Sequence, residues 1–218
     1  MSLLFSSLIF LLLTSFLFSL IITKILVKIM TYLKIVDKPE KRRVHNITTP
    51  RGGGLALVLI YCILLPIFEY YWTGYFNYSS DIIQLLIPIA LISFLDDIIG
   101  VNNSFRLFIH SLSSFLAILW LIHPERILSI DLPIIKNIPM LADLIIGTFA
   151  LMTFLNIYNF MDGIDGITAM QSIHFSVFMI LLCFLQSNNI NNVGFIITTS
   201  ILILGWGVGF LFYNWHPA

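Results

Sequence analysis

Long apolar runs dominate this sequence and limit the folds that it can adopt. Only 10% of the residues are charged, whereas a water-soluble domain carries about 25%. A helix needs about 20 apolar residues to cross a bilayer. The sequence therefore predicts an all-α integral membrane protein, a single domain over residues 1–218 built as a bundle of about seven transmembrane helices. The predicted spans are Leu3–Met30, Gly54–Phe68, Ile82–Leu95, Phe105–Ile122, Leu141–Asn159, Ile167–Leu185 and Val193–Phe212.

The third apolar run is short, so we expect its helix to continue through Asp96–Ile99 in order to cross the hydrocarbon layer. Glycines in "GWGVG" (Gly205–Gly209) predict close packing between helices, and Cys62 and Cys183 lie in apolar runs as small packing residues. The segment "RILSIDLPIIKNIPM" (Arg126–Met140) alternates briefly and predicts a short hairpin on the outer surface.

The distribution of basic residues predicts how the chain is oriented in the membrane. Eight of the 11 Lys and Arg residues lie between Lys24 and Arg51. Because cytoplasmic loops are rich in Lys and Arg, this loop is expected to be cytoplasmic and the N-terminus periplasmic. The formal net charge is zero, so no nucleic acid partner is expected.

Four polar clusters fall on the predicted cytoplasmic side, and we expect them to form one common site. They are loop one, Pro39–Gly54; loop two, Phe94–Gly100; loop three, Met161–Gly166, which follows Asn156 and Asn159; and the C-terminal segment Tyr213–Ala218. The basic residues predict which loops are cytoplasmic, and the polar clusters fall in those same loops. Because nothing requires the two features to coincide, their agreement supports an active site at the cytoplasmic face.

Two adjacent carboxylates, Asp96 and Asp97, follow the third apolar run. Carboxylates at the end of a helix oppose its macrodipole, and they are costly near hydrocarbon. A site that binds a cation would justify that cost. The alternative interpretation is that both residues simply mark the water interface.

A series of amides and carboxylates, Asn156, Asn159, Asp162 and Asp165, recurs at three-residue spacing. Neighbouring members adjoin on a helix, so the series predicts a set that wraps around a ligand at the end of the helix. Their oxygens are hard ligands suited to Mg²⁺. The alternative is a capped loop in which these side chains satisfy local backbone groups.

Loop one combines His45 and Arg51 with three glycines in "RRVHNITTPRGGG". Basic side chains beside a flexible glycine run suit phosphate contacts, although the same charges could act only as an orientation signal. Carboxylates, Mg²⁺ and phosphate contacts at a membrane surface together predict phosphoryl transfer between a lipid and a soluble partner.

These segments resemble one family, the polyprenyl-phosphate N-acetylhexosamine-1-phosphate transferases, which include the phospho-MurNAc-pentapeptide translocases (glycosyltransferase 4). The matching segments, in family order, are "HNITTPRGGGLAL" (His45–Leu57), "FLDDIIG" (Phe94–Gly100), "NIYNFMDGIDG" (Asn156–Gly166) and "NWHPA" (Asn214–Ala218).

The resemblance implies transfer of a sugar-1-phosphate from a UDP-N-acetylhexosamine to undecaprenyl phosphate, with Mg²⁺, at the bacterial cytoplasmic membrane. The products would be a lipid-diphospho-sugar and UMP, and the enzyme could be a homodimer. "NFMDGIDG" resembles the O-antigen and common-antigen branch more than the peptidoglycan branch. The implied catalytic residues are Asp96, Asp97, Asp162 and Asp165, and the implied metal ligands are Asn159 and Asp162. The implied substrate- and cofactor-binding residues are Asn156, Asn159, Asn214, His45, Arg51 and Arg106.

Two departures from the family pattern stand out. Many relatives have Gln four residues after the loop-two arginine, where this chain has His110 after Arg106. Relatives also continue beyond the segment that matches Asn214–Ala218 into a metal-binding aspartate, further helices and a His-rich loop. We therefore expect residues 1–218 to be the N-terminal portion of a larger fold and to be inactive alone, which UMP release by the purified fragment would refute.

Two other classes of protein fit part of the pattern. An ion-coupled transporter also uses aspartates at helix ends, but its site lies near the midplane, whereas the acidic clusters here are predicted at the cytoplasmic face. A non-catalytic membrane subunit is the other alternative, and co-purification with a larger complex without Mg²⁺ or nucleotide would favour it.

Overall fold

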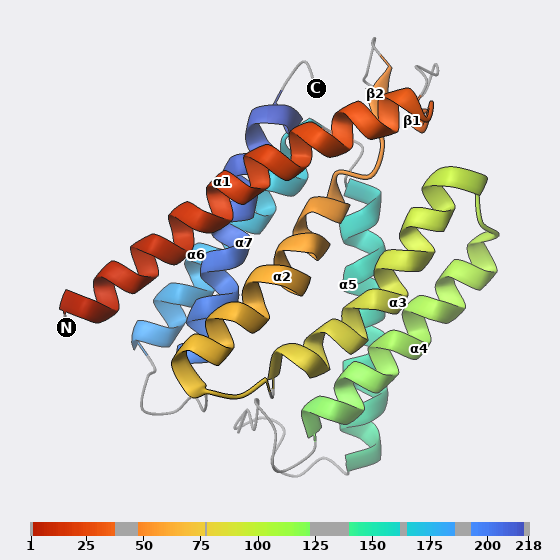
Figure 1. Cartoon of the computed structure of the whole chain (residues 1–218). Coiled ribbons are helices and arrows are strands. Elements are labelled where there is room, and N and C mark those ends of the chain that lie inside the picture. Colours follow the sequence, from red (N-terminus) through yellow and green to blue (C-terminus); the bar gives the residue numbers. More distant parts are fainter. Residues whose placement is uncertain are drawn as a thin grey trace.

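The computed structural model of this chain describes residues 2–37, 48–76, 78–122, 140–161, 165–185 and 193–215. The described part is a helical bundle with one very small strand pair (Figure 1). The helices are α1 (Ser2–Tyr32), α2 (Gly54–Thr73), α3 (Tyr78–Ile99), α4 (Asn103–Ile122), α5 (Met140–Met161), α6 (Ile167–Leu185) and α7 (Val193–Asn214).

The predicted all-α membrane fold is confirmed. Six described helices are long and apolar enough to cross a membrane: α1, α2, α3, α5, α6 and α7. The third helix continues through Asp96 and Asp97 to Ile99, as predicted. Helix α4 has the expected position but is less apolar than its neighbours, because its first half carries Arg106, His110 and several serines. The predicted outer hairpin lies almost entirely outside the described residues.

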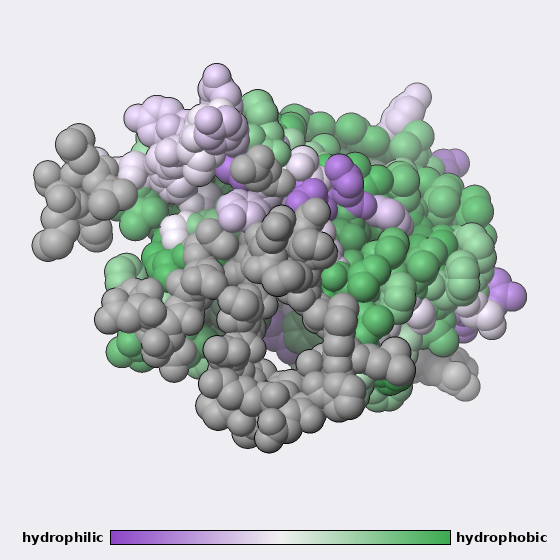
Figure 2. Space-filling model, turned by 90° about the horizontal axis from the view of Figure 1, so that it is seen from below, coloured by the Kyte–Doolittle hydropathy of each residue, from purple (hydrophilic) through white to green (hydrophobic). Residues whose placement is uncertain are grey.

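Many side chains are distributed inside-out relative to a soluble protein. Small polar residues are buried, including Ser15, Ser19 and Thr23 on α1. Large apolar residues of the same helix, such as Leu17 and Ile21, are exposed. Hydrophobic residues also cover much of the visible surface in Figure 2. A lipid environment explains this distribution, because exposed apolar side chains contact hydrocarbon there.

The helices form two groups. Helix α7 packs against α1, α2 and α6, and α4 packs against α3 and α5. Contacts between α2 and α3 and between α5 and α6 join the groups. The buried apolar core lies in the first group and includes Leu11, Ile60, Leu202 and Trp206.

The glycines of Gly205–Gly209 bring α7 very close to its neighbours, as predicted. A Cβ atom on Gly209 would lie 2.7 Å from Ser19 Cβ and 2.9 Å from Phe16 O, and Gly205 has the same relation to Ser15 and Leu12. A Cβ atom on Gly207 would lie 2.9 Å from Ile173 Cγ1 of α6. Ser15 Oγ donates to Leu202 O at 2.7 Å, and Ser19 Oγ donates to Trp206 O at 3.0 Å. Glycine therefore permits helix contacts through both van der Waals packing and hydrogen bonds.

A two-residue antiparallel pair closes the base of loop one. Strand β1 (Val36–Asp37) pairs with β2 (Thr49–Pro50), with Val36 opposite Pro50 and Asp37 opposite Thr49. The next residue, Arg51, donates its backbone N–H to Ile35 O at 3.1 Å. Strand β2 and the first turn of α2 lie at the end of the bundle where α3, α5 and α7 terminate (Figure 1), and Arg51 and the following glycines connect these two elements.

Candidate functional site

A tight turn joins α3 to α4 and positions the loop-two carboxylates. Gly100 has a φ of 66° and donates its N–H to Asp96 O at 3.0 Å, which closes the end of α3 with the left-handed residue that such a cap requires. Asn102 Oδ1 accepts the Ser104 N–H at 2.9 Å, the usual way in which an asparagine begins a helix. The turn is therefore specified locally by glycine and asparagine.

The Asp96 carboxylate is held on both oxygens. Its Oδ1 accepts the Val101 N–H at 2.9 Å, and its Oδ2 accepts Arg106 Nη1 at 2.5 Å. The Asp96 and Arg106 side chains are 24% and 27% exposed, so the pair is partly shielded from solvent and stronger than a fully exposed ion pair. Sequence analysis predicted both residues in the site, but not this pairing.

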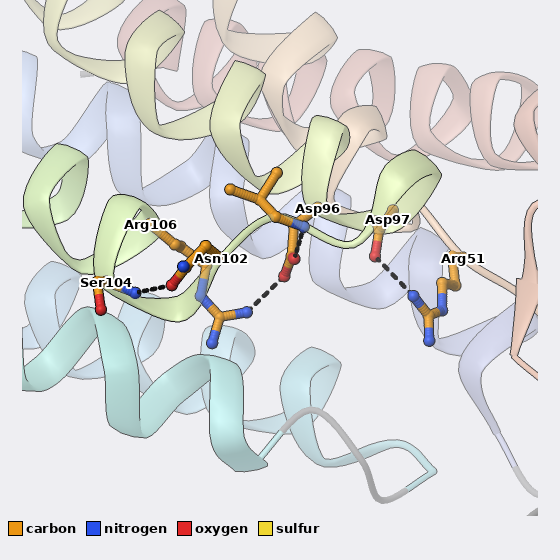
Figure 3. Close-up of polar contacts among 7 residues, drawn as sticks. Arg51, Asp96, Asp97, Asn102, Ser104 and Arg106 are labelled. Atoms are coloured by element: carbon orange, nitrogen blue, oxygen red, sulfur yellow. Dashed lines mark hydrogen bonds and ion pairs between the residues drawn. The ribbon is translucent and has the colours of Figure 1, made fainter.

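Asp97 faces a different arginine. Arg51 Nη1 lies 3.9 Å from Asp97 Oδ1, an ion pair that is longer than a hydrogen bond. Figure 3 shows Asp96 directed toward Arg106 and Asp97 directed toward Arg51. Each of the two adjacent carboxylates thus has its own guanidinium group, which offsets their mutual repulsion and the unfavourable helix dipole. Loop one and loop two meet through this pair.

Loop one also contacts the end of α7. A Cβ atom on Gly53 would lie 2.6 Å from Phe210 Cζ, whereas no described residue lies within 4 Å of the corresponding position on Gly54. Phe210 is stacked on Trp206, with ring centroids 5.1 Å apart and planes inclined by 9°. The glycine run therefore lets loop one lie directly against α7, one turn before Asn214.

These adjacent glycines give a matched pair of variants. Gly53→Ala is expected to destabilise the protein by about 1–3 kcal/mol, because the added methyl group displaces a packed aromatic ring. Gly54→Ala should be neutral or slightly stabilising, because the methyl group meets open space and alanine favours the helix. Thermal unfolding in detergent measures both, and equal effects of the two substitutions would contradict the contact.

Tyr158 connects the two helices on either side of loop three. Its hydroxyl donates to Thr168 O at 3.0 Å and makes a short hydrogen bond with Ser172 Oγ, which joins the end of α5 to the first turns of α6. Gly166, at a φ of 75°, begins the α6 side of the loop, and a Cβ atom there would lie 3.8 Å from Asn214 O. The end of loop three therefore lies beside the end of α7, where the two groups of helices meet.

Four predicted site residues lie on the elements that end at this junction. Asn214 Oδ1 is shielded from solvent and makes no hydrogen bond with any described residue. Asp165 Oδ1 is also shielded from solvent. Asn156 Nδ2 donates to Met152 O at 2.8 Å, while Asn159, near the end of α5, is exposed.

The structure brings most of the predicted site together at one end of the bundle. Ion pairs link Arg51 to Asp97 and Arg106 to Asp96, and close packing links loop one and loop three to α7. Asp162 and His45 lie outside the described residues. Within the described ranges, no group of three or more His, Cys, Asp or Glu residues could hold a metal ion.

Sequence reasoning missed the roles of Tyr158 and Phe210 in arranging the site. In the sequence, Tyr158 and Phe210 cannot be distinguished from the other aromatic residues of the apolar runs. The spacing from Asp96 to Arg106, on opposite sides of a "GVNN" turn, is a signal that could have predicted the observed ion pair.

Comparison with known proteins identifies the family of this chain. Residues 81–218 match the family described as glycosyl transferase family 4. Phospho-N-acetylmuramoyl-pentapeptide-transferase of Borrelia turicatae is 26% identical over 206 residues, which cover 84% of this chain and 58% of the relative. The enzyme of the same name from Borrelia hermsii has the same identity and coverage. This chain therefore spans 58% of the length of these relatives. The matched segment contains both aspartates of loop two, loop three and Asn214, and the chain belongs to glycosyl transferase family 4.

Proposed function

We propose that this chain carries the site of a membrane phosphosugar transferase, which moves an N-acetylhexosamine-1-phosphate from a UDP-sugar to undecaprenyl phosphate. The observation that carries the proposal is the junction of the two helix groups, where two Asp–Arg pairs lie at the same end of the bundle as the shielded Asn214 Oδ1. Family membership favours this function over an ion-coupled transporter or a non-catalytic subunit.

The acceptor phosphate supplies the attacking oxygen. With a second pKa near 6, a phosphate monoester is mostly dianionic at neutral pH. One of its oxygens bonds to the phosphorus that bears the sugar, and the bond from that phosphorus to the bridging oxygen breaks. UMP leaves with the electron pair, and the lipid retains the sugar diphosphate. A general base assists this reaction but is not compulsory.

The two arginines are suited to hold these anions. A guanidinium group binds phosphate oxygens through paired N–H donors, and Arg51 and Arg106 lie at the junction already directed toward carboxylates. We propose that an incoming phosphate shares these guanidinium groups with Asp96 and Asp97. The arginines then reduce the repulsion between the two phosphate groups and hold them in reach of one another.

The two aspartates have different roles in this proposal. Both Asp96 oxygens accept strong hydrogen bonds, from Val101 and Arg106, so this residue orients the arginine. Asp97 is 33% exposed and its Arg51 contact is long. It is the better candidate to take a proton from, or to position, the lipid phosphate.

The residues present fit a magnesium ion. Asn214 Oδ1 is a shielded hard oxygen that makes no hydrogen bond with a described residue, and the amides near the end of α5 and the carboxylates of loop three are of the type that Mg²⁺ binds. Asn159 and Asp162 are the proposed ligands, with substrate phosphates in other positions. When bound, Mg²⁺ would neutralise the charge of the diphosphate.

The site is proposed to face the cytoplasm of a bacterial inner membrane, with the N-terminus periplasmic, and a homodimer is the proposed assembly. Two donors are candidates. The names of the relatives favour UDP-N-acetylmuramoyl-pentapeptide, whereas the "NFMDGIDG" motif favours another UDP-N-acetylhexosamine such as UDP-N-acetylglucosamine.

The test is release of UMP by the purified protein, at the full length that its gene encodes, in detergent with undecaprenyl phosphate. We expect release with at least one of the two donors, its loss on chelation with EDTA and its recovery with excess Mg²⁺. The ratio of the two rates identifies the donor. Absence of UMP with both donors, or release that does not depend on the lipid phosphate, would contradict the proposal.

A further inference from the structure

His110 is a buried polar residue that the proposed reaction does not yet use. It lies on α4 one turn after Arg106 and is 2% exposed. Neither of its ring nitrogens makes a hydrogen bond within the part of the chain that the structure describes. Buried polar atoms normally have partners, so an unpartnered imidazole inside the bundle points to a hydrogen bond that forms in the working state.

A neutral acceptor lies beside the ring. The Asn156 side chain, from α5, lies beside it, and Arg106 and Asp96 are the charged groups near enough to act on it. Asn156 Nδ2 already donates to Met152 O at 2.8 Å. This bond fixes the amide and leaves Oδ1 as the atom that can accept a ring N–H.

A second unpartnered group lies on the same face of α4. Ser114 is fully buried, its Oγ makes no hydrogen bond with a described residue, and it follows His110 by four residues, which places the two one turn apart. A neutral imidazole has one N–H donor and one nitrogen acceptor. It can therefore donate its N–H to Asn156 Oδ1 and accept the Ser114 hydroxyl once that hydroxyl turns toward the ring, a bond that the two groups do not make in the described structure.

We propose that His110 is a positioning residue, which holds Asn156 Oδ1 through a ring N–H and so sets the end of α5 that carries Asn159. The relay would run from the Ser114 hydroxyl through the imidazole to the Asn156 amide and then to Met152 O. It couples α4, which carries Arg106, to α5, which leads into loop three. This inference rests on the proposed function for its effect on turnover, but not for the hydrogen bond itself.

Glutamine provides the conservative test of this role. A primary amide also has both a donor and an acceptor, so His110→Gln can replace both ends of the relay, whereas His110→Leu fills the space and removes both. His174→Leu is the matched control, because His174 is an exposed histidine on α6 whose Nδ1 contacts Met170 O within its own helix.

The experiment measures kcat for UMP release with the full-length protein, together with thermal unfolding of each variant in detergent. We expect His110→Leu to lower kcat about 10-fold, His110→Gln to remain within about 3-fold of the original protein, and His174→Leu to have no effect. In an Asn156→Ala background, His110→Leu should cause little further loss, because coupled residues are not additive.

Three results would overturn the inference: unchanged turnover in His110→Leu, equal impairment in His110→Gln and His110→Leu, or losses that multiply when Asn156→Ala is combined with His110→Leu. If the original protein releases no UMP, the proposed function fails and the same set of variants is compared by thermal unfolding. Additive shifts in Tm for His110→Leu and Asn156→Ala would then refute the hydrogen bond, and non-additive shifts would support it.

Discussion

Asp97→Asn is expected to lower turnover by about 100-fold or more, because a positioned general base contributes about 10²–10⁴-fold. The substitution keeps the size of the side chain and removes its charge and its proton affinity. Asparagine also keeps an oxygen at the position that faces Arg51, 3.9 Å away from Asp97. The measurement is kcat for UMP release by the full-length protein, with thermal unfolding to confirm that the variant is folded.

Asp81→Asn is the control for this prediction. Asp81 lies on the same helix at its opposite end, where its Oδ2 accepts Trp120 Nε1 at 2.9 Å, and the oxygen of an asparagine can still accept that bond. Its turnover should remain near that of the original protein. If Asp97→Asn also retains near-normal turnover, Asp97 is not the base and the lipid phosphate reacts without one.

Gly209→Leu should prevent α1 and α7 from packing. Even a methyl group would lie 2.7 Å from Ser19 Cβ and 2.9 Å from a backbone oxygen of α1, and a backbone atom cannot move aside as a side chain can. Overpacking of this kind costs typically 1–3 kcal/mol and occasionally more. We expect about 3 kcal/mol or more here, seen as a large fall in Tm or as loss of folded protein after extraction in detergent.

Gly194→Leu is the control, since Gly194 is an exposed residue in the first turn of α7, and within the described ranges no other atom lies within 4 Å of its Cβ position. It should fold and unfold like the original protein. Comparable destabilisation by both substitutions would show that leucine destabilises α7 wherever it is placed, and that overlap with α1 is not the cause.

The helices could be predicted from sequence because the membrane imposes their length and apolarity. The first and last residues of α6 agree with the predicted run Ile167–Leu185. The prediction for α2 was too short, because the predicted run stopped at Phe68, before a charged residue, whereas the helix continues to Thr73.

The charged residue that follows Phe68, Glu69, is only 4% exposed. Its carboxylate accepts the N–H groups of Tyr78 and Ser79 at 2.7 and 2.8 Å, so it caps the start of α3 from within the bundle.

Residue type and spacing selected the residues that meet at this end of the bundle, and the ten-residue spacing also indicates the Asp96–Arg106 pair, but the pairing of Asp97 with Arg51 could not be predicted. Asp96 and Asp97 are adjacent in sequence, yet one faces an arginine ten residues later and the other an arginine from loop one. Such choices depend on how the helices pack. The contact between Gly53 and Phe210 likewise joins distant segments, which no local pattern encodes.

The bond between Ser15 and Leu202 joins residues 187 positions apart, and this separation has a consequence for biosynthesis. Helix α1 leaves the ribosome before the other six described helices, whereas the surface it packs against lies on α7, which is synthesised after all of them. During translation, the serines of α1 must therefore stay in the lipid or the insertion machinery without their final acceptors. The interface between α1 and α7 therefore forms late. Until then, the lipid or the insertion machinery must keep α1 from packing against other partners.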